Sequence, residues 1–306
     1  MPGCAIHLEL AGRVLRGWQA QAAKKPFPPD DPSCRRAFLF GSLAPDLGYF
    51  PGGDGLLAEL AHCVRTSELA RNLIATAKNE QDIALAWGWV THILADVWIH
   101  PLINQAAAER ITGRRTPGLT YVDDPATHVR VELGLDAILP LRDRWPDPDW
   151  GRSLDPGRCA SEALARAFRQ TYGFEPSVAR MRVVNRLSTR FVAMLLQGGR
   201  VVSGRPTSAL TRLAHRGAAS LTRRLGRGGS FEALSNPFPP PDWLLDETSA
   251  VVESFCERFQ HYYASNLEGL PDFNLDTGEV EEDPPRYLLT VAALEKVGRR
   301  RPAPRL

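Results

Sequence analysis

The chain has 306 residues, of which 43% are hydrophobic and 24% charged, a composition typical of a globular protein that excludes wholesale disorder. A formal net charge of +2 gives the whole molecule no general attraction to nucleic acid. Five scattered cysteines without a CxxC pair exclude a disulfide framework and cysteine-based zinc fingers. Histidine is the unevenly distributed residue, because five of the seven lie within the first 128 positions.

The amino-terminal segment does not have the pattern of a signal peptide. It lacks a basic start, and His7, Glu9 and Arg13 interrupt its apolar residues. The most apolar segment, residues 83–103, contains two histidines and an aspartate, whose exposure to lipid would be costly. We therefore expect a cytoplasmic chain without a transmembrane helix.

Apolar residues recur mainly at helical spacing along the chain. This periodicity predicts helices at residues 8–22, 56–77, 81–104, 127–139, 159–172, 175–196, 208–225, 242–266 and 285–297. A short apolar run covers residues 35–43, and Pro101 is expected to cut the third helix short. Period-2 alternation is scarce and no Asn-Gly hairpin occurs, so we expect an all-α fold.

The clearest internal joint is the Pro- and Gly-rich segment at residues 142–157. We expect residues 1–145 to form the metal-binding half of one catalytic domain. Residues 146–296 would be the Arg-rich helical remainder of the same domain, and residues 297–306 a loose basic tail.

The most informative motif is AWGWVTHILADVWIHPLIN, which contains His92, Asp96 and His100. Their spacing of four residues places all three side chains on one stripe of a helix. The rest of this helix is apolar, so the stripe would bury two imidazoles and a carboxylate without partners. Because such burial is costly, a metal cation that binds them together is the favoured explanation.

Further candidate ligands lie on both sides of this motif. His128 and Glu132 are four residues apart on a later predicted helix, a spacing that offers two ligands to one ion. Asp46 follows a proline turn, and His62 lies within a predicted helix. A single such histidine is more often a core or capping residue, but the combination supplies ligands for two to three Zn²⁺ ions. Neither an HExxH motif nor a His-Asp doublet is present.

In order, the motifs H…GSxxPD…H…AWGWxxHxxADxxxH…HxxxE resemble the zinc-dependent phospholipase C family over residues 4–140. Within it, the chain is most similar to the catalytic region of glycosylphosphatidylinositol-specific phospholipase D. Single-strand-specific zinc nucleases are more distant relatives on the same helical scaffold. The resemblance implies a centre of three zinc ions. The implied ligands are Asp46, His62, His92 and Asp96 for the first ion, bridging Asp96 with His7 for the second, and His100, His128 and Glu132 for the third.

The same resemblance assigns Asp46 one of two roles, metal ligand or catalytic general base. It also implies that the amino terminus contributes a ligand. Removal of Met1 would leave Pro2 five positions before His7, which is the spacing in the family, so we expect the Pro2 amine and carbonyl to bind zinc. Cys4 is an alternative thiolate donor or a small core residue.

These features predict a zinc-dependent phosphodiester hydrolase of the phospholipase C or D type, in which zinc-activated hydroxide attacks phosphorus. We expect Tyr49 and Phe50 to form a pocket rim, and Trp87, Trp89 and Trp98 to be mainly core residues. Two alternatives are a single-strand nuclease of the same superfold and a non-catalytic, metal-stabilised lipid-binding domain.

An arginine-rich stretch follows in the second half of the chain. No acidic residue occurs between Glu175 and Glu232. The stretch is either a solvated face balanced by acidic residues 272–283 or a surface for anionic membrane lipid, with nucleic acid a weaker possibility. Its arginines are Arg180, Arg182, Arg186, Arg190, Arg200, Arg205, Arg212, Arg216, Arg223, Arg224 and Arg227.

Overall fold

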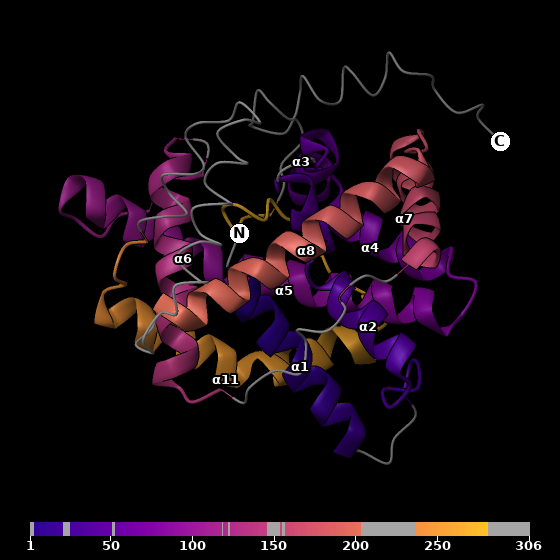
Figure 1. The fold of residues 1–306 in the computed structure, drawn as a ribbon, viewed down its shortest axis with the longest axis horizontal. Helices are drawn as coiled ribbons and strands as arrows, with labels where there is room; N and C mark the ends of the chain where they lie inside the picture. Colours follow the sequence, from indigo (N-terminus) through magenta and orange to yellow (C-terminus); the bar gives the residue numbers. More distant parts are fainter. Residues whose placement is uncertain are drawn as a thin grey trace.

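In a computed structural model of the chain, the described residues are 3–20, 25–50, 53–117, 119–121, 123–145, 154, 157–202 and 237–280. Over these ranges the regular structure is helical, with one isolated β-bridge between Phe273 and Val280 (Figure 1). The all-α prediction is therefore confirmed. None of the helices within these ranges combines the length and the apolar character that crossing a bilayer requires.

The described elements, in chain order, are α1 (Cys4–Ala20), α2 (Pro32–Gly41), the 3-10 helix η1 (Ala44–Gly48), α3 (Gly55–Cys63), α4 (Thr66–Ala75), α5 (Glu80–Thr112), α6 (Pro125–Arg142), α7 (Gly157–Tyr172), α8 (Val178–Val202) and α11 (Asp242–Ala264). The predicted helices at residues 208–225 and 285–297, and most of the predicted joint at 142–157, lie outside the described residues.

Helix α5 runs through the middle of the molecule, with α1, α2, α4, α6, α7 and α11 packed around it (Figure 1). It begins at Asn79, whose side chain accepts a hydrogen bond from the Asp82 amide, and ends at Gly113 in the left-handed conformation. Helix α2 crosses it closely, because Gly41 and Gly88 have no side chains to separate the two backbones. A Cβ atom at Gly88 would lie 2.0 Å from the Phe38 carbonyl oxygen.

The prediction that Pro101 cuts this helix short is wrong, since α5 continues to Thr112. Proline removes the N–H that would bond to the Val97 carbonyl, at a cost of about 3 kcal/mol. The following turns are nevertheless rich in alanine, which favours helix, and Ile103 and Ala107 are buried in the core. Tertiary packing and propensity together outweigh the lost hydrogen bond.

The single helix predicted for residues 56–77 is also wrong, because the chain forms α3 and α4 with a break between them. Arg65 has a left-handed backbone with φ of 50°, and its guanidinium donates a hydrogen bond to the Thr171 carbonyl in α7. Apolar periodicity continues across the break, so sequence spacing alone does not reveal it. The bend ends α3 directly after His62.

The segment after α11 returns to the region between α3 and α4. The amides of Ser67 and Glu68 donate to the Asp272 carboxylate, and the Leu275 amide donates to the His62 carbonyl at 2.8 Å. These contacts join positions about 200 residues apart in sequence. They bring the loop at residues 271–280 to the carboxyl end of α3 and to the second half of α5, where Asn104 donates to the Asp276 carbonyl.

Candidate metal centre

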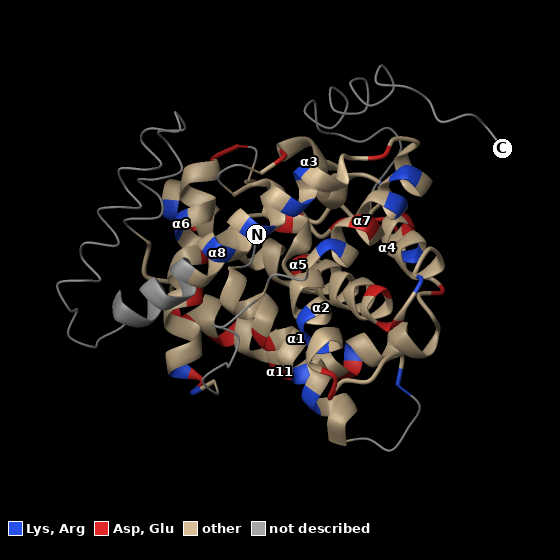
Figure 2. Cartoon of the chain, turned by 45° about the vertical axis from the view of Figure 1, so that its right-hand side comes forward, with Lys and Arg blue, Asp and Glu red and all other residues tan. Residues whose placement is uncertain are grey.

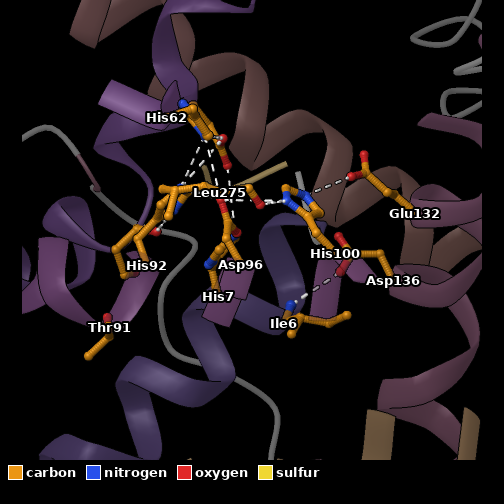
Figure 3. A network of polar contacts seen from close by, with 12 residues as sticks. Ile6, His7, His62, Thr91, His92, Asp96, His100, Glu132, Asp136 and Leu275 are labelled. Carbon is orange, nitrogen blue, oxygen red and sulfur yellow. Dashed lines mark hydrogen bonds and ion pairs between the residues drawn. The ribbon is translucent and has the colours of Figure 1, made fainter. Parts of the chain in front are cut away.

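Eight imidazole and carboxylate side chains converge in the interior. Figure 3 labels His7, His62, His92, Asp96, His100 and Glu132 among them. They come from α1, η1, α3, α5 and α6, and all are buried. Among the described residues, the candidate ligand atoms lie within 4.8 Å of one another in three groups, of which the first two share His92. The groups are His7, His92 and Asp96; Asp46, His62 and His92; and His100, His128 and Glu132.

Helix α5 contributes the central part of this cluster. His92, Asp96 and His100 follow one another on successive turns of one face, as their spacing predicts. The ring of His7, on α1, stacks on that of His92 with centroids 4.2 Å apart. The stacked rings both direct Nε2 to the Asp96 carboxylate, His7 at 3.3 Å and His92 at 3.0 Å.

The first two groups share His92, and their ligand atoms lie close together. His62 Nε2 lies 3.0 Å from Asp46 Oδ1, and His92 Nε2 lies 3.0 Å from Asp96 Oδ2. The two Nε2 atoms are 3.3 Å apart, and His7 Nε2 lies 3.3 Å from Asp96 Oδ1. Asp96 is therefore surrounded by imidazole nitrogens, which suits a carboxylate that bridges two cations.

The third group lies next to Asp96, further along α5. His128 Nε2 lies 2.9 Å from Glu132 Oε1 within α6, and His100 Nε2 lies 3.4 Å from the same oxygen. His100 Nδ1 is 3.9 Å from Asp96 Oδ2. The three groups thus form one continuous cluster, with Asp96 between the first two groups and the third.

Backbone carbonyls orient three of the rings, a feature that sequence spacing did not reveal. His62 Nδ1 donates to the carbonyl of Ala58, one turn earlier on α3. His92 Nδ1 donates to the Ser42 carbonyl at the end of α2, and His100 Nδ1 donates to the Leu275 carbonyl. In each ring the remaining nitrogen, Nε2, turns toward the cluster as a lone-pair donor. Such outer hydrogen bonds usually fix metal-binding histidines.

The local electrostatics keep the carboxylates ionised. Burial alone would raise the pKa of Asp96, but His92, His100 and His7 lower it well below its usual range. Burial likewise opposes ionisation of Asp46, yet the surrounding imidazoles lower its pKa. Burial lowers the pKa of His92, which favours the neutral ring that a metal requires.

The donor set fits zinc. Several of its buried atoms make no hydrogen bond with the described part of the chain, including His7 Nε2, both Asp96 oxygens, Asp46 Oδ2 and His100 Nε2. Leaving such atoms without partners is costly in a protein interior. Imidazole nitrogen and carboxylate oxygen are ligands that zinc accepts, and cations would compensate the three buried carboxylates.

Other predicted positions have different outcomes. Pro2 lies outside the described residues, so its role as a ligand stays a prediction. Cys4 is buried in the core, where burial raises the pKa of its thiol well above the usual value. Tyr49 is half-buried, with its ring 5.1 Å from that of His62. Phe50 is instead buried against Phe191 and does not form a rim.

Sequence comparison agrees with this geometry. A family model described as zinc dependent phospholipase C matches residues 6–172, which is more than half of the chain and includes the eight candidate ligands that the structure brings together. The chain belongs to the zinc-dependent phospholipase C family. An uncharacterised protein of Archaeoglobus fulgidus is 24% identical over 171 residues, which are 54% of this chain. The likeness to glycosylphosphatidylinositol-specific phospholipase D stays a prediction.

This zinc-dependent phospholipase C family member spans about half the length of that archaeal relative, since the match covers 52% of it. No solved structure matches the chain. The family match ends at residue 172, and the loop at 271–280 that contacts His62 and His100 lies outside it. The contribution of this loop to the centre is therefore a finding of the structure.

Proposed function

We propose that the protein is a zinc-dependent phosphodiester hydrolase that acts on phospholipid or a related head-group ester. The observation that carries this proposal is the position of Asp96, whose Oδ1 lies 3.3 Å from His7 Nε2 and whose Oδ2 lies 3.0 Å from His92 Nε2. Each oxygen of one carboxylate thereby faces a different imidazole, an arrangement that would suit a carboxylate shared by two Zn²⁺ ions.

Different residues of the chain would hold the different ions of such a centre. His62 and His92, with Asp46 and Asp96, would hold one ion; His7 and Asp96 would hold the second, and His100, His128 and Glu132 the third. When bound, zinc lowers the pKa of a coordinated water and neutralises phosphate oxygens. The chain buries all of these donors away from bulk water.

The role of Asp46 can be separated experimentally. Its Oδ1 lies 3.0 Å from His62 Nε2, while its Oδ2 makes no hydrogen bond with the described part of the chain. Asp46→Asn keeps the shape of the side chain but removes its negative charge. If Asp46 is a ligand, the variant binds fewer zinc ions per chain. If it is the general base, zinc content is unchanged while turnover falls by about 10²–10⁴-fold.

The outer face of α8 supports a lipid substrate and an anionic membrane surface as partner. Val183 and Leu187 are exposed on this face, and Arg182, Arg186 and Arg190 are exposed beside them. Apolar and basic side chains on one helix are typical of segments that bind anionic bilayers. The arginines from Arg205 to Arg227 lie outside the described residues.

The decisive experiment combines metal analysis with product analysis. We expect two to three zinc ions per chain and hydrolysis of phosphatidylcholine or a chromogenic choline phosphodiester. Diacylglycerol as product would identify cleavage on the glycerol side of phosphorus, and phosphatidate cleavage on the head-group side. Cleavage of single-stranded DNA without lipid turnover would instead support the nuclease alternative. Zinc occupancy with neither activity would support the non-catalytic alternative and contradict the proposal.

A further inference from the structure

The ring of His7 differs from the other rings of the metal centre in how it is held. Nδ1 of His62, His92 and His100 each donates to a backbone carbonyl. His7 is only 1% exposed, yet its Nδ1 makes no hydrogen bond with the part of the chain that the structure describes. No outer hydrogen bond fixes this ring, so the backbone of α1 must determine where its Nε2 lies.

Helix α1 follows a residue that has no side chain to cap it. The Gly3 carbonyl accepts hydrogen bonds from the amides of Ile6, at 3.1 Å, and His7, at 3.4 Å, so Gly3 occupies the N-cap position. Acidic residues are distributed over many elements (Figure 2), but α1 has none in its first turn. The first amides of this helix therefore need an acceptor from another part of the chain.

Asp136, on α6, supplies this acceptor. Its Oδ2 accepts from the Ala5 amide at 2.9 Å, and its Oδ1 accepts from the Ile6 amide at 3.2 Å (Figure 3). Gly3 permits the close approach, because a Cβ there would lie 2.0 Å from Asp136 Cγ. One carboxyl group thus holds the first turn of α1 directly before His7.

Asp136 lies on the same face of α6 as two candidate ligands of the third group. His128, Glu132 and Asp136 are four residues apart in succession, so their side chains share one side of the helix. His128 and Glu132 belong to the third group, whereas Asp136 belongs to none of the three. This face of α6 therefore contacts both the third group and the start of the helix that carries His7.

We propose that Asp136 is a positioning residue of the metal centre. It fixes the first turn of α1 so that His7 Nε2 lies next to the Asp96 carboxylate, at 3.3 Å from Oδ1. Asp136 acts through His7 and does not itself bind zinc. This inference rests on the zinc centre of the proposed function, but not on which ester that centre hydrolyses.

Asp136→Asn tests this role, with the release of zinc to a chromogenic chelator as the readout. Asparagine keeps the shape of the side chain but leaves only one oxygen to accept from the two amides. The ion held by His7 should bind about 10–100-fold more weakly, as is usual when a contact that orients a ligand is lost. The ion held by the third group should be released as in the unchanged protein.

Asp31→Asn is the matched control. Asp31 accepts hydrogen bonds from the amides of Ser33 and Cys34, both at 2.8 Å, at the start of α2, which carries none of the candidate ligands. It therefore removes a similar helix cap and should leave zinc affinity unchanged. Equal zinc affinity of Asp31→Asn and Asp136→Asn overturns the proposal. Gly3→Ala displaces the Asp136 carboxylate from the other side and should weaken the same ion, which decides the question if Asp136→Asn does not fold.

A double-mutant cycle distinguishes positioning of His7 from a general loss of stability. His7→Ala alone should lose the ion that His7 holds, so adding Asp136→Asn should change neither the zinc content nor the affinity of the remaining ions. A further loss of zinc in the double variant would overturn action through His7. These measurements need no substrate, so a protein that binds zinc without hydrolysing lipid would contradict only the proposed function. A chain that binds no zinc would overturn both.

Discussion

His100 donates a hydrogen bond from Nδ1 to the backbone carbonyl of Leu275, 175 positions later in the chain (Figure 3). The contact turns His100 Nε2 toward Glu132, 3.4 Å away. One turn further along α5, Asn104 donates to the Asp276 carbonyl. The loop at residues 271–280 therefore orients the third group of candidate ligands, although it lies outside the part of the chain that matches the family.

Gly278→Ala should displace this loop and weaken zinc binding. Gly278 has φ of +71°, and a Cβ there would lie 2.5 Å from the Val97 carbonyl oxygen and 2.8 Å from the Pro101 ring. Loss of an orienting contact to a ligand typically lowers metal affinity by about 10–100-fold. Competition with a chromogenic chelator measures this change for the most weakly held ion.

The matched control for this variant is Gly269→Ala. Gly269 has a similar φ of +75°, but no atom of the described residues lies within 4 Å of the position of its Cβ. It therefore reproduces the backbone strain without the collision. Indistinguishable zinc affinities for the two variants would contradict a role of loop position in metal binding.

His92→Ala should remove zinc from two of the three groups, because His92 belongs to both. The group of His100, His128 and Glu132 should keep its ion, so the zinc content falls but does not reach zero. Elemental analysis of dialysed protein measures the zinc per chain, and hydrolysis should fall by at least about a hundredfold. His261→Ala is the control, since His261 is exposed on α11. If His92→Ala kept its full zinc content, His92 could not be a ligand in both groups.

Gly88→Ala should separate α2 from α5. The added methyl would lie 2.0 Å from the Phe38 carbonyl oxygen, so the helices must move apart and the Ser42 carbonyl leaves His92 Nδ1. Overpacking of this kind lowers the free energy of unfolding by about 1–3 kcal/mol, which urea denaturation of the zinc-free protein measures. Zinc affinity should fall as well.

Gly17→Ala is the control for the effect of replacing a glycine by alanine within a helix. Gly17 lies within α1, and within the described part of the chain no atom is closer than 4 Å to the position of its Cβ. Alanine should therefore raise the free energy of unfolding by up to about 1 kcal/mol. We expect Gly88→Ala to lower the free energy of unfolding and Gly17→Ala to raise it. If both substitutions raised it, the close packing of α2 on α5 would be contradicted.

Asp136 should make the zinc-free protein less stable as the pH rises. Burial raises the pKa of its carboxyl to about 7, although the amides of Ala5 and Ile6 donate to it. The folded chain therefore holds a proton that the unfolded chain releases near the ordinary value of 3.8. The resulting stabilisation is complete below that pH and is lost as the pH rises through about 7, a change on the order of 4 kcal/mol.

Asp136→Asn tests this titration. The variant cannot ionise, so its free energy of unfolding relative to the unchanged protein should increase between pH 5 and pH 8. Urea denaturation at each pH gives the difference, in which the titration of the metal ligands cancels because both proteins share it. A difference that is constant with pH would show that Asp136 does not titrate in this range.

Much of the centre could be predicted from local spacing. His92, Asp96 and His100 lie on one face of α5, and His128 and Glu132 on one face of α6, because a helix places every fourth side chain on the same side. The presence of these ionisable groups in otherwise apolar helices is itself a sequence pattern, and it indicates a metal. Local sequence encodes these features because they depend on neighbours within one element.

Helix packing decides how these local features combine. Arg65 breaks the predicted helix after His62, α5 continues beyond Pro101, and the Leu275 carbonyl reaches His100. No rule based on residue spacing predicts these three features, since each depends on contacts between residues far apart in the chain and on how the helices pack. The amino-acid sequence thus specifies which side chains can bind metal, while helix packing specifies which backbone carbonyls orient them. Every residue has a backbone carbonyl, so only its position in space distinguishes one carbonyl from another.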